Sequence, residues 1–590
     1  MSKHTYDSGL IGNCAYIAHI EKDTNISWLC MPRFDSDFIF GGMLDRKKGG
    51  KFTVLPESGD YTSTQTYVEN TNILETIVRN GSDSYKVTDF APRFKNYDRY
   101  YKPLMLIRKV EPISGSPKIR IECQPVTERG QIQLTPSQGS NHIRYMGIDQ
   151  ELRLTTNAPL TYVCEKKSFA LQRPVYLVLT YGRPLEAPIE STSERFLQST
   201  REYWQAWVKS TSIPNFHQRL VLRSALILKI HQFEDTGAII AASTTSLPES
   251  PGSTRNWDYR YCWMRDAYFV LSAFVRCGLQ DEAEAYFNWL MHATQRDKPE
   301  LRPVYDIFGR SDLPEKEVSH LEGYRNSAPV RIGNGASQQV QLDSYGSVIL
   351  GARALVEQGG TFGRSEAKRL AGFVETVCGN WQQPDNGIWE MRRGRLHHLY
   401  SKAMCWGALD GALWLEERDL LELDRDKVRS NLDTIRAVVL EHGWNEDRQA
   451  YTGALDCEHL DASVLLLPKL GIIEADHPRM VATYERIDAE LAKGSFVWRY
   501  DPSIDDNSSP EGAFMACSFW AAEYLALAGR RDEAAGRMRK LLGAGNDLRI
   551  FSEEYDPEAQ IMLGNLPQGL SHAALVHAAL ALGEKNGDEV

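Results

Sequence analysis

The spacing of hydrophobic positions divides the chain near residue 190. Upstream, short runs rich in β-branched and aromatic residues alternate with clusters of Gly, Pro, Asn and Ser, a pattern typical of closely spaced strands. Because this stretch lacks long helical periods, we expect it to form an antiparallel β-sandwich. The predicted strands lie near 51–55, 73–79, 85–90, 104–110, 118–123 and 175–181.

Residues 192–210 show a helical period instead. Phe196, Tyr203 and Trp207 fall on one apolar face, so we expect a helix that connects two domains. The predicted division is an N-terminal β-sandwich at 1–191, a linker helix at 192–212 and a helical domain at 213–590.

Helical periodicity continues from residue 216 to the end. Four of the predicted helices end in glycine, as helix C-termini often do. Twelve helices in consecutive antiparallel pairs fit an (α/α)6 barrel, which is the architecture we expect after the sandwich. They are predicted near 216–232, 265–278, 281–294, 341–357, 364–379, 401–417, 425–442, 460–470, 476–492, 512–529, 531–543 and 567–583.

The connections between these helices differ in length and chemistry. Those that lead into the even-numbered helices are mostly long and rich in Trp, Arg, His, Asp and Glu. In a barrel of alternating helices such connections open at one end, where helix N-termini also present free N–H groups. We therefore expect one polar pit, formed by 255–266, 320–341, 385–402, 458–461, 510–511 and 551–568.

Composition and charge remove several classes of function. Lys and Arg number 67 against 78 Asp and Glu, so the net charge is 67 − 78 = −11, which disfavours a nucleic-acid or anionic-membrane partner. The ten cysteines are scattered without a CxxC pair, so we expect no zinc site and no cofactor. The first residues lack an apolar signal region, and we expect a cytoplasmic protein with reduced thiols. Assembly into a homo-oligomer stays open.

A candidate acid lies in the third long connection, PDNGIWEMRRGRLHHLYSKAMCW, at 384–406. Glu390 follows Trp389, and an indole that withdraws water from a carboxyl group raises its pKa, as a general acid requires. His397 and Lys402 offer hydrogen bonds to a polyol. The alternative is a polar loop between two helices.

The first and second connections supply candidate binding groups. Trp263, Arg265 and Asp266 begin a predicted helix, either as an ion pair that caps it or as donors and acceptors for sugar hydroxyls. Arg331 and Asn334 lie in the second connection, where each could equally be a surface loop residue. The glycines around Asn334 indicate a turn, because neither a preceding strand nor a following Lys-Ser/Thr marks a phosphate loop.

A second carboxylate comes from the last connection. Glu553 and Glu554 follow an apolar residue, and either of them could be the base. Glu390 and Glu553 are 553 − 390 = 163 residues apart, so only the fold can bring them together. Two carboxyl groups that flank a substrate among aromatic and polyol-binding side chains are typical of glycoside hydrolysis. No P-loop or GxSxG motif supports another reaction.

Several segments together resemble glycoside hydrolase family 15, which contains glucoamylases, glucodextranases and bacterial-type trehalases. They are GLIGNCAYIA, ISWLCMPRFDS, NWDYRYCWMRDA, HLEGYRNSAPVRIGN, GIWEMR, HHLYSKAMCW, EGAFMACSFW and FSEEYDP. The first two are similar to a trehalase-like N-terminal domain. The resemblance implies a β-sandwich before an (α/α)6 barrel. It also implies exo-acting, inverting cleavage of a terminal α-glucosyl unit with release of β-glucose.

The same resemblance implies roles for individual residues. Glu390 matches the family's acid and Glu553 its base, which leaves Glu554 where the family has Gln. Arg265 and Asp266 match the element that holds the terminal sugar. The chain departs from the family at Gln338, an amide where relatives often have a carboxylate.

Two other functions stay open at this point. One is an inactive carbohydrate-binding protein on the same fold, and the other is a phosphorylase that uses phosphate in place of water. Among substrates, trehalose, isomaltose-type chains and malto-oligosaccharides all present a terminal α-glucosyl unit.

Overall fold

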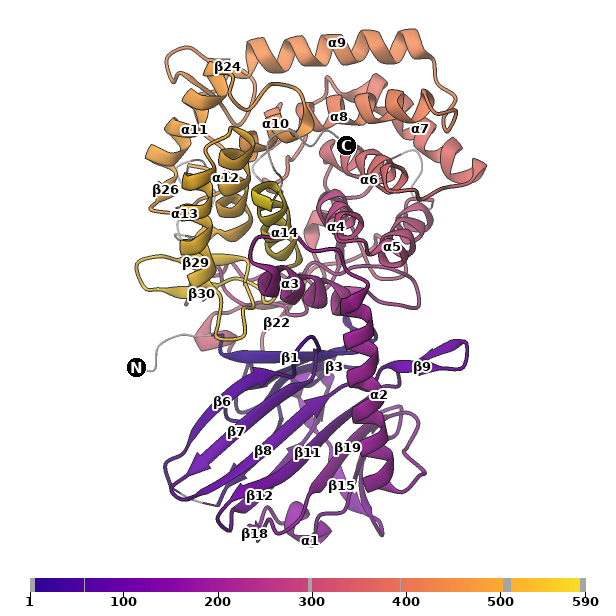
Figure 1. Cartoon of the computed structure of the whole chain (residues 1–590), viewed down its shortest axis with the longest axis vertical. Helices are drawn as coiled ribbons and strands as arrows, with labels where there is room; N and C mark the ends of the chain where they lie inside the picture. The colour runs from indigo at the N-terminus through magenta and orange to yellow at the C-terminus, as the bar shows by residue number, and fades with distance from the viewer. Residues whose placement is uncertain are drawn as a thin grey trace.

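Strands form the first third of the molecule and helices the rest, as the sequence predicts (Figure 1). The computed structural model describes residues 6–57, 59–295, 300–392, 394–501, 504 and 511–583. The strand-rich part lies at one end of the long axis and the helices at the other, and a long helix, α2, runs between them.

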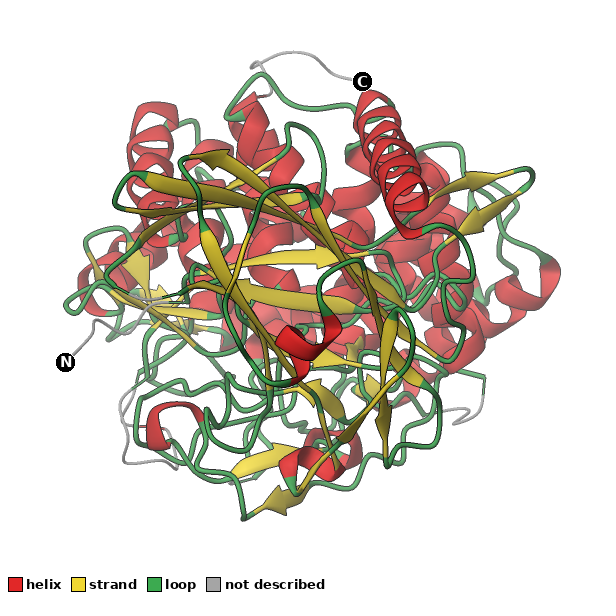
Figure 2. Ribbon diagram, turned by 90° about the horizontal axis from the view of Figure 1, so that it is seen from below, coloured by secondary structure: helices red, strands yellow, loops and turns green. Residues whose placement is uncertain are grey.

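The strand-rich part contains an eight-stranded sheet in the order β15-β16-β17-β19-β11-β8-β7-β6, with antiparallel neighbours throughout. Figure 2 shows the strands of this part in yellow, seen from below, with the helices behind them. The strands of the large sheet are β6 (Thr62–Tyr67), β7 (Leu74–Asn80), β8 (Asp83–Phe90), β11 (Met105–Ser114), β15 (Thr135–Gln138), β16 (His142–Met146), β17 (Leu152–Thr156) and β19 (Val175–Tyr181). Smaller sheets are formed by β5 (Lys51–Pro56), β12 (Lys118–Gln124) and β18 (Phe169–Ala170), and by β1 (Ser8–Gly12), β2 (Ile17–Glu21), β3 (Ile26–Cys30) and β4 (Phe38–Phe40). All six predicted runs coincide with strands.

A buried arginine of the large sheet links it to the smaller sheets. Arg108 on β11 donates to Asp89 Oδ1 on β8 at 2.7 Å, and neither side chain is exposed. The same guanidinium donates to the carbonyl oxygens of Phe52 on β5 (2.8 Å) and Thr24 (2.5 Å). A buried charge is tolerated when it is paired and hydrogen-bonded in this way, so Arg108 fixes the two layers relative to each other.

Helix α2 (Ile189–Lys209) covers part of the large sheet. Its Phe196 and Leu197 pack with Ile107 and Val178 in a separate apolar cluster. The helix begins three residues before the predicted start, directly after Pro188, whose fixed φ suits a helix N-terminus.

The helices that follow α2 in the chain lie within three residues of the bounds predicted for them. They are α3 (Gln218–His231), α4 (Met264–Arg276), α5 (Gln280–Ala293), α6 (Asp343–Glu357), α7 (Arg364–Asn380), α8 (Leu399–Glu416), α9 (Arg425–His442), η4 (Ala462–Leu466) continued by α10 (Leu467–Leu470), α11 (Pro478–Glu490), α12 (Met515–Leu527), α13 (Arg531–Leu541) and α14 (Gly569–Gly583). Among these described helices, α4, α6, α8, the η4–α10 segment, α12 and α14 contact one another in a closed cycle. The connections into this inner set meet at one end.

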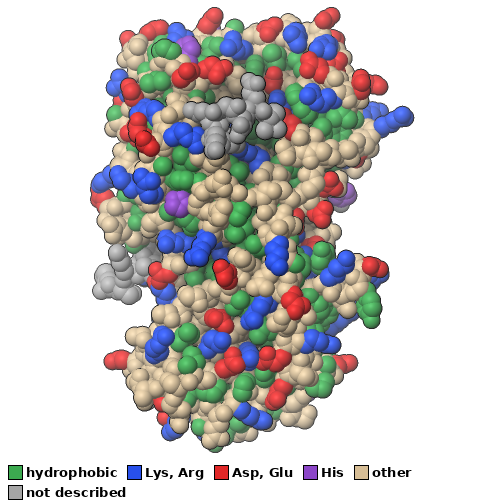
Figure 3. Space-filling view, in the orientation of Figure 1, with side chains coloured by type: hydrophobic (Ala, Val, Ile, Leu, Met, Phe, Trp, Pro, Cys, Tyr) green, Lys and Arg blue, Asp and Glu red, His purple; other side chains and the backbone are tan. Residues whose placement is uncertain are grey.

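The visible surface carries acidic and basic side chains interspersed, without a continuous basic field (Figure 3). In the ranges that the structure describes, no helix is both long enough and apolar enough to cross a lipid bilayer.

Candidate active site

A cavity of about 290 Å³ lies where the connections into the inner helices meet. Four of the candidate site residues line it: Arg331, Asn334, Trp389 and Glu390. The rest of its wall comes from Glu249, Thr254, Arg255, Trp257, Tyr259, Met391, Arg392, Arg499, Tyr500 and Ile504.

Glu390 is held at the wall of this cavity by two donors. Its Oε1 accepts from Trp263 Nε1 at 2.6 Å and from an Arg265 guanidinium nitrogen at 3.1 Å. Its side chain is 15% exposed, and burial raises the pKa of its carboxyl group, although the charge of Arg265 and the Trp263 hydrogen bond oppose the rise. The residue adopts φ 61°, a left-handed conformation that is uncommon for residues other than glycine and is often found at functional sites.

The indole that hydrogen-bonds to Glu390 is therefore that of Trp263, not the sequence neighbour Trp389. Trp389 points its N–H at Asp461 instead, at 3.0 and 2.9 Å from the two carboxylate oxygens. Phe514 packs edge-on against Trp389, with ring centroids 5.3 Å apart. Trp389 is thus a fixed wall of the cavity.

Arg265 and Asp266 lie together at the start of α4. Arg265 Nε donates to Asp266 Oδ1 at 2.7 Å, and both side chains are buried. Asp266 Oδ2 has no hydrogen-bond partner among the described residues. A buried acceptor left unpaired is costly, and a hydroxyl of a bound ligand would satisfy it.

Glu553 lies just before β29 (Glu554–Asp556) and is 1% exposed. Its Oε2 accepts from the backbone N–H of Asn565 at 3.3 Å. Burial and the charge of Glu249 raise the pKa of Glu553 to about 7, against the lowering effects of Arg499, the Asn565 N–H and the Tyr259 hydroxyl. A carboxyl with this pKa exchanges a proton near neutral pH.

Tyr259 connects the two candidate catalytic carboxyls. Its ring stacks on Trp263, with centroids 4.8 Å apart and planes 23° apart. Trp263 donates to Glu390, and the Tyr259 hydroxyl lies near enough to Glu553 to lower the pKa of its carboxyl group. The stacked pair therefore has one ring beside each of the two carboxyls.

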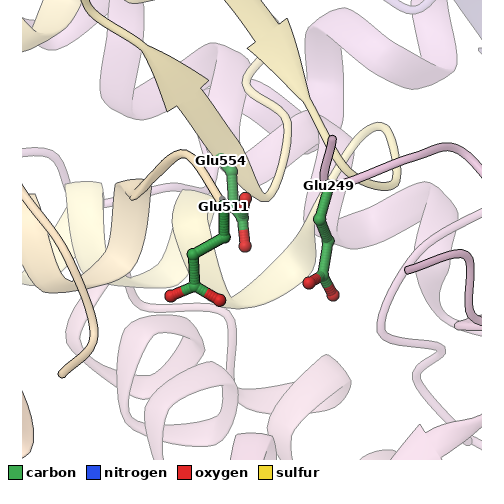
Figure 4. Close-up of side chains that lie close together, drawn as sticks. All are labelled: Glu249, Glu511 and Glu554. Atoms are coloured by element: carbon green, nitrogen blue, oxygen red, sulfur yellow. The ribbon is translucent and has the colours of Figure 1, made fainter. Parts of the chain in front are cut away.

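Three further carboxylates lie beside Glu553. Glu249, Glu511 and Glu554 come from separate segments and bring their oxygens within 4.8 Å of one another (Figure 4). Burial and the charges of Glu249 and Glu511 raise the pKa of Glu554 well above its usual value. Glu554 Oε2 accepts from the Gly512 N–H at 2.8 Å.

Two arginines compensate this cluster. Arg255 is 2.5 Å from Glu249 and from Glu511, and Arg499 is 2.5 Å from Glu511 and 3.6 Å from Glu554. Because guanidinium groups already neutralise these carboxylates, the cluster does not have the character of a metal site.

The outer wall of the cavity is built around Trp257. The guanidinium groups of Arg331 and Arg392 lie over its ring, at 4.6 and 4.2 Å from a ring centroid. Glu315 pairs with both, at 3.6 and 3.1 Å. Arg331 is also fixed by the carbonyl oxygen of Thr254 at 2.7 Å. Two arginines that are held by an aromatic ring and a shared carboxylate therefore form this part of the wall.

Several predicted site residues are not among the side chains that line this cavity: Trp263, Arg265, Asp266, His397, Lys402 and Glu553. His397 is exposed, away from the wall. Lys402 is buried in α8, where its ammonium donates to the carbonyl oxygens of Trp381 (2.6 Å) and Gln383 (2.5 Å). We correct the assignment of Lys402, which is buried and anchors the preceding loop. The role of His397 stays a prediction. Pro510, predicted at the pit, lies outside the described residues.

Sequence reasoning missed several residues of the wall. Arg255, Trp257 and Tyr259 lie in the first connection, which was predicted to open into the pit, but they were not named as individual site residues. Glu249 and Arg499 lie outside the connections singled out, and nothing local distinguishes them from surface residues.

The chain is similar to proteins of known family and fold. The family model "Glycosyl hydrolases family 15" matches residues 215–580, and "Trehalase-like, N-terminal" matches residues 5–167. A trehalase of Thermoplasma acidophilum is 35% identical, over 95% of this chain and 97% of its own. A trehalase of Mycobacterium tuberculosis is 32% identical, over 94% of this chain and 86% of its own. Among solved structures, a bacterial glucoamylase complexed with acarbose superposes with a TM-score of 0.70 at 16% identity, covering 99% of this chain and 95% of that one.

Proposed function

The chain belongs to glycosyl hydrolase family 15 and is a glycoside hydrolase, and we propose that it cleaves a terminal α-glucosyl unit by an inverting mechanism, with trehalose as substrate. The observation that carries this proposal is the stacked Tyr259–Trp263 pair: Trp263 donates a hydrogen bond to the candidate acid, and Tyr259 lies beside the candidate base.

In this mechanism the terminal glucosyl unit lies against Arg265 and Asp266. The unpaired Asp266 Oδ2 accepts a sugar hydroxyl, and Arg265 donates to a neighbouring one. Glu390, whose pKa is raised by burial, gives its proton to the glycosidic oxygen as the bond to the anomeric carbon breaks. Glu553 takes a proton from a water that attacks the opposite face of the sugar.

Trehalose is favoured over longer glucans by two observations. The relatives at 35% and 32% identity are trehalases and match almost the whole chain. The cavity is also at the small end of the range for ligand sites, roughly 300–1,000 Å³, which suits a disaccharide. The leaving glucose would then face Arg331 and Arg392 beside Trp257.

The experiment is proton NMR of the sugars released from trehalose, recorded before mutarotation. A single displacement inverts the attacked unit, so it yields β-glucose from that unit and α-glucose from the leaving unit in equal amounts. A double displacement would give α-glucose alone and would overturn the roles of Glu390 and Glu553. Release of glucose 1-phosphate that depends on added phosphate would instead indicate a phosphorylase.

We also infer the architecture behind this site. The closed cycle of contacts among six described inner helices supports an (α/α)6 barrel, with α3, α5, α7, α9, α11 and α13 outside it. We propose a β-sandwich domain at 1–191, a linker at 192–212 and the catalytic barrel at 213–590. The position of α2 between the two parts supports this division.

A further inference from the structure

A second cavity, of about 690 Å³, lies away from the catalytic carboxylates, where the β-sandwich, α2 and the outer helices meet. One wall is the hairpin of β9 (Phe94–Asn96) and β10 (Arg99–Tyr101), which projects beside α2 in Figure 1. The other walls are α2, the end of α3 and the first turns of α5. None of its lining residues belongs to the catalytic cavity.

Aromatic side chains form one wall of this junction cavity. Arg93 is held between Tyr100 and Tyr203, with its guanidinium 4.9 and 4.7 Å from their ring centroids. Arg93 is 1% exposed, pairs with Glu234, and has a buried Nε without a partner among the described residues. Tyr100 lines the cavity and is 49% exposed, so part of its aromatic ring is accessible to a ligand.

The floor is polar and held in place by its own hydrogen bonds. Glu282 Oε1 accepts from Trp207 Nε1 at 2.8 Å and lies 3.0 Å from Lys229 Nζ. Gln232 Nε2 donates to the Glu282 carbonyl oxygen at 2.8 Å. These side chains come from α2, α3 and α5, so the floor is organised before any ligand enters.

The charges of the lining residues select the class of ligand. Three cations (Arg93, Lys95 and Lys229) face four carboxylates (Glu202, Glu234, Asp281 and Glu282), and therefore no positive excess attracts a phosphate or another anion. Hydroxyl groups donate and accept together, so a polyol satisfies such a mixture of ammonium, amide and carboxylate groups. An exposed aromatic ring beside them suits the apolar face of a sugar ring.

We propose that this junction cavity is a second, non-catalytic saccharide-binding site that takes a neutral mono- or disaccharide. Because its walls come from the sandwich and from the helical part, a bound sugar contacts both and strengthens their association. The inference does not depend on the roles of Glu390 and Glu553.

The test counts bound sugar by equilibrium dialysis with labelled trehalose, using the full chain with Glu553→Gln to suppress turnover. Ala206→Trp, on the exposed face of α2 that lines the cavity, should fill it. Ser191→Trp, exposed on the same helix outside the cavity, is the matched control. We expect a second trehalose per chain in the Glu553→Gln chain and its Ser191→Trp version, and its loss with Ala206→Trp.

A single bound trehalose in all three proteins, or a second one that persists with Ala206→Trp, overturns the proposal. If Glu553→Gln still hydrolyses trehalose, the assignment of the base fails, and the same count is made with glucose. The hypothesis of a second saccharide site and the hypothesis that Glu553 is the base are therefore contradicted by different results.

Discussion

At the scale of single residues, Glu554 explains how Glu553 can stay ionised inside a cluster of acids. Both are buried, but the pKa of Glu554 is raised well above its usual value, whereas that of Glu553 rises to about 7. The pair therefore places its first proton on Glu554. A protonated Glu has the shape of Gln, the residue that the family resemblance implies at this position.

This assignment predicts that two substitutions affect the pH profile of kcat/KM differently. Glu554→Gln should keep kcat/KM and leave the acidic limb of its pH profile in place, because it replaces a neutral group by a neutral one. Glu249→Gln removes a charge that raises the pKa of Glu553, so the acidic limb should move to lower pH, by about one unit. Equal shifts in the two variants would show that Glu554 is ionised.

Glu390 gives a second prediction at this scale. Glu390→Gln cannot donate a proton, so trehalose hydrolysis should fall by about 10²–10⁴-fold. A glucosyl fluoride, whose leaving group needs little acid assistance, should lose much less. Steady-state kinetics on both substrates decide the matter, and equal losses would contradict an acid role. Glu315→Gln, at the outer wall, is a control for a carboxylate lost near the cavity.

At the scale of elements, the η4 segment fixes the wall that precedes the acid. Asp461, the N-cap of η4, accepts from the Ser463 N–H at 2.8 Å and from the Trp389 indole. Its carboxylate thus joins the start of an inner helix to the residue next to Glu390.

Asp461→Ala should therefore lower kcat/KM roughly tenfold, the equivalent of about 1.4 kcal/mol for one hydrogen bond to a charged group. Asp461→Asn keeps an acceptor for the indole and should recover part of the loss. The control is Asp456→Ala, an exposed carboxylate in the same connection. Wild-type kinetics for Asp461→Ala would mean that Trp389 is held by packing alone.

Elements were also the level at which the sequence was most informative. The 3.6-residue period and the glycines at helix ends predicted the positions of all twelve helical segments. The Trp389–Glu390 pair indicated Glu390 as a candidate acid. The 460–470 segment is partly 3₁₀, and Pro468 within it lacks the N–H that a regular helix would use. The Arg255–Arg499–Glu511 network could not be predicted, because its members are adjacent only after the chain has folded.

At the scale of the whole molecule, buried histidines make the structure sensitive to acid. His19 on β2, His231 on α3 and His572 on α14 are all fully buried. His19 Nε2 lies 2.7 Å from Ser243 Oγ, which ties the sandwich to the helical part. Burial lowers the pKa values of His19 and His572 to about 3 and that of His231 to about 4.

Because these folded-state values lie below the unfolded value of 6.5, the unfolded chain binds more protons as the pH falls. The stabilising contribution is present above pH 6.5 and is lost toward pH 3–4, at up to about 1.4 kcal/mol per pH unit for each histidine. Calorimetry from pH 7 to 4 should show a falling Tm. His19→Gln should flatten this slope, while His292→Gln at an exposed position should not; parallel slopes in wild type and His19→Gln would contradict the prediction.

The sheet formed by β1 to β4 contacts a segment near residue 546, far along the chain. Asn546 donates to the carbonyl oxygens of Tyr6 and Ser8, so β1 receives a partner 546 − 8 = 538 residues downstream. At a synthesis rate of roughly 5–20 residues per second, that partner leaves the ribosome about half a minute to two minutes after β1. During this interval β1 to β4, buried along almost their whole length in the native state, lack the cover that the helical part provides. Production of this enzyme in a cell should therefore depend on chaperones that shield nascent chains, and on an unbroken pace of translation.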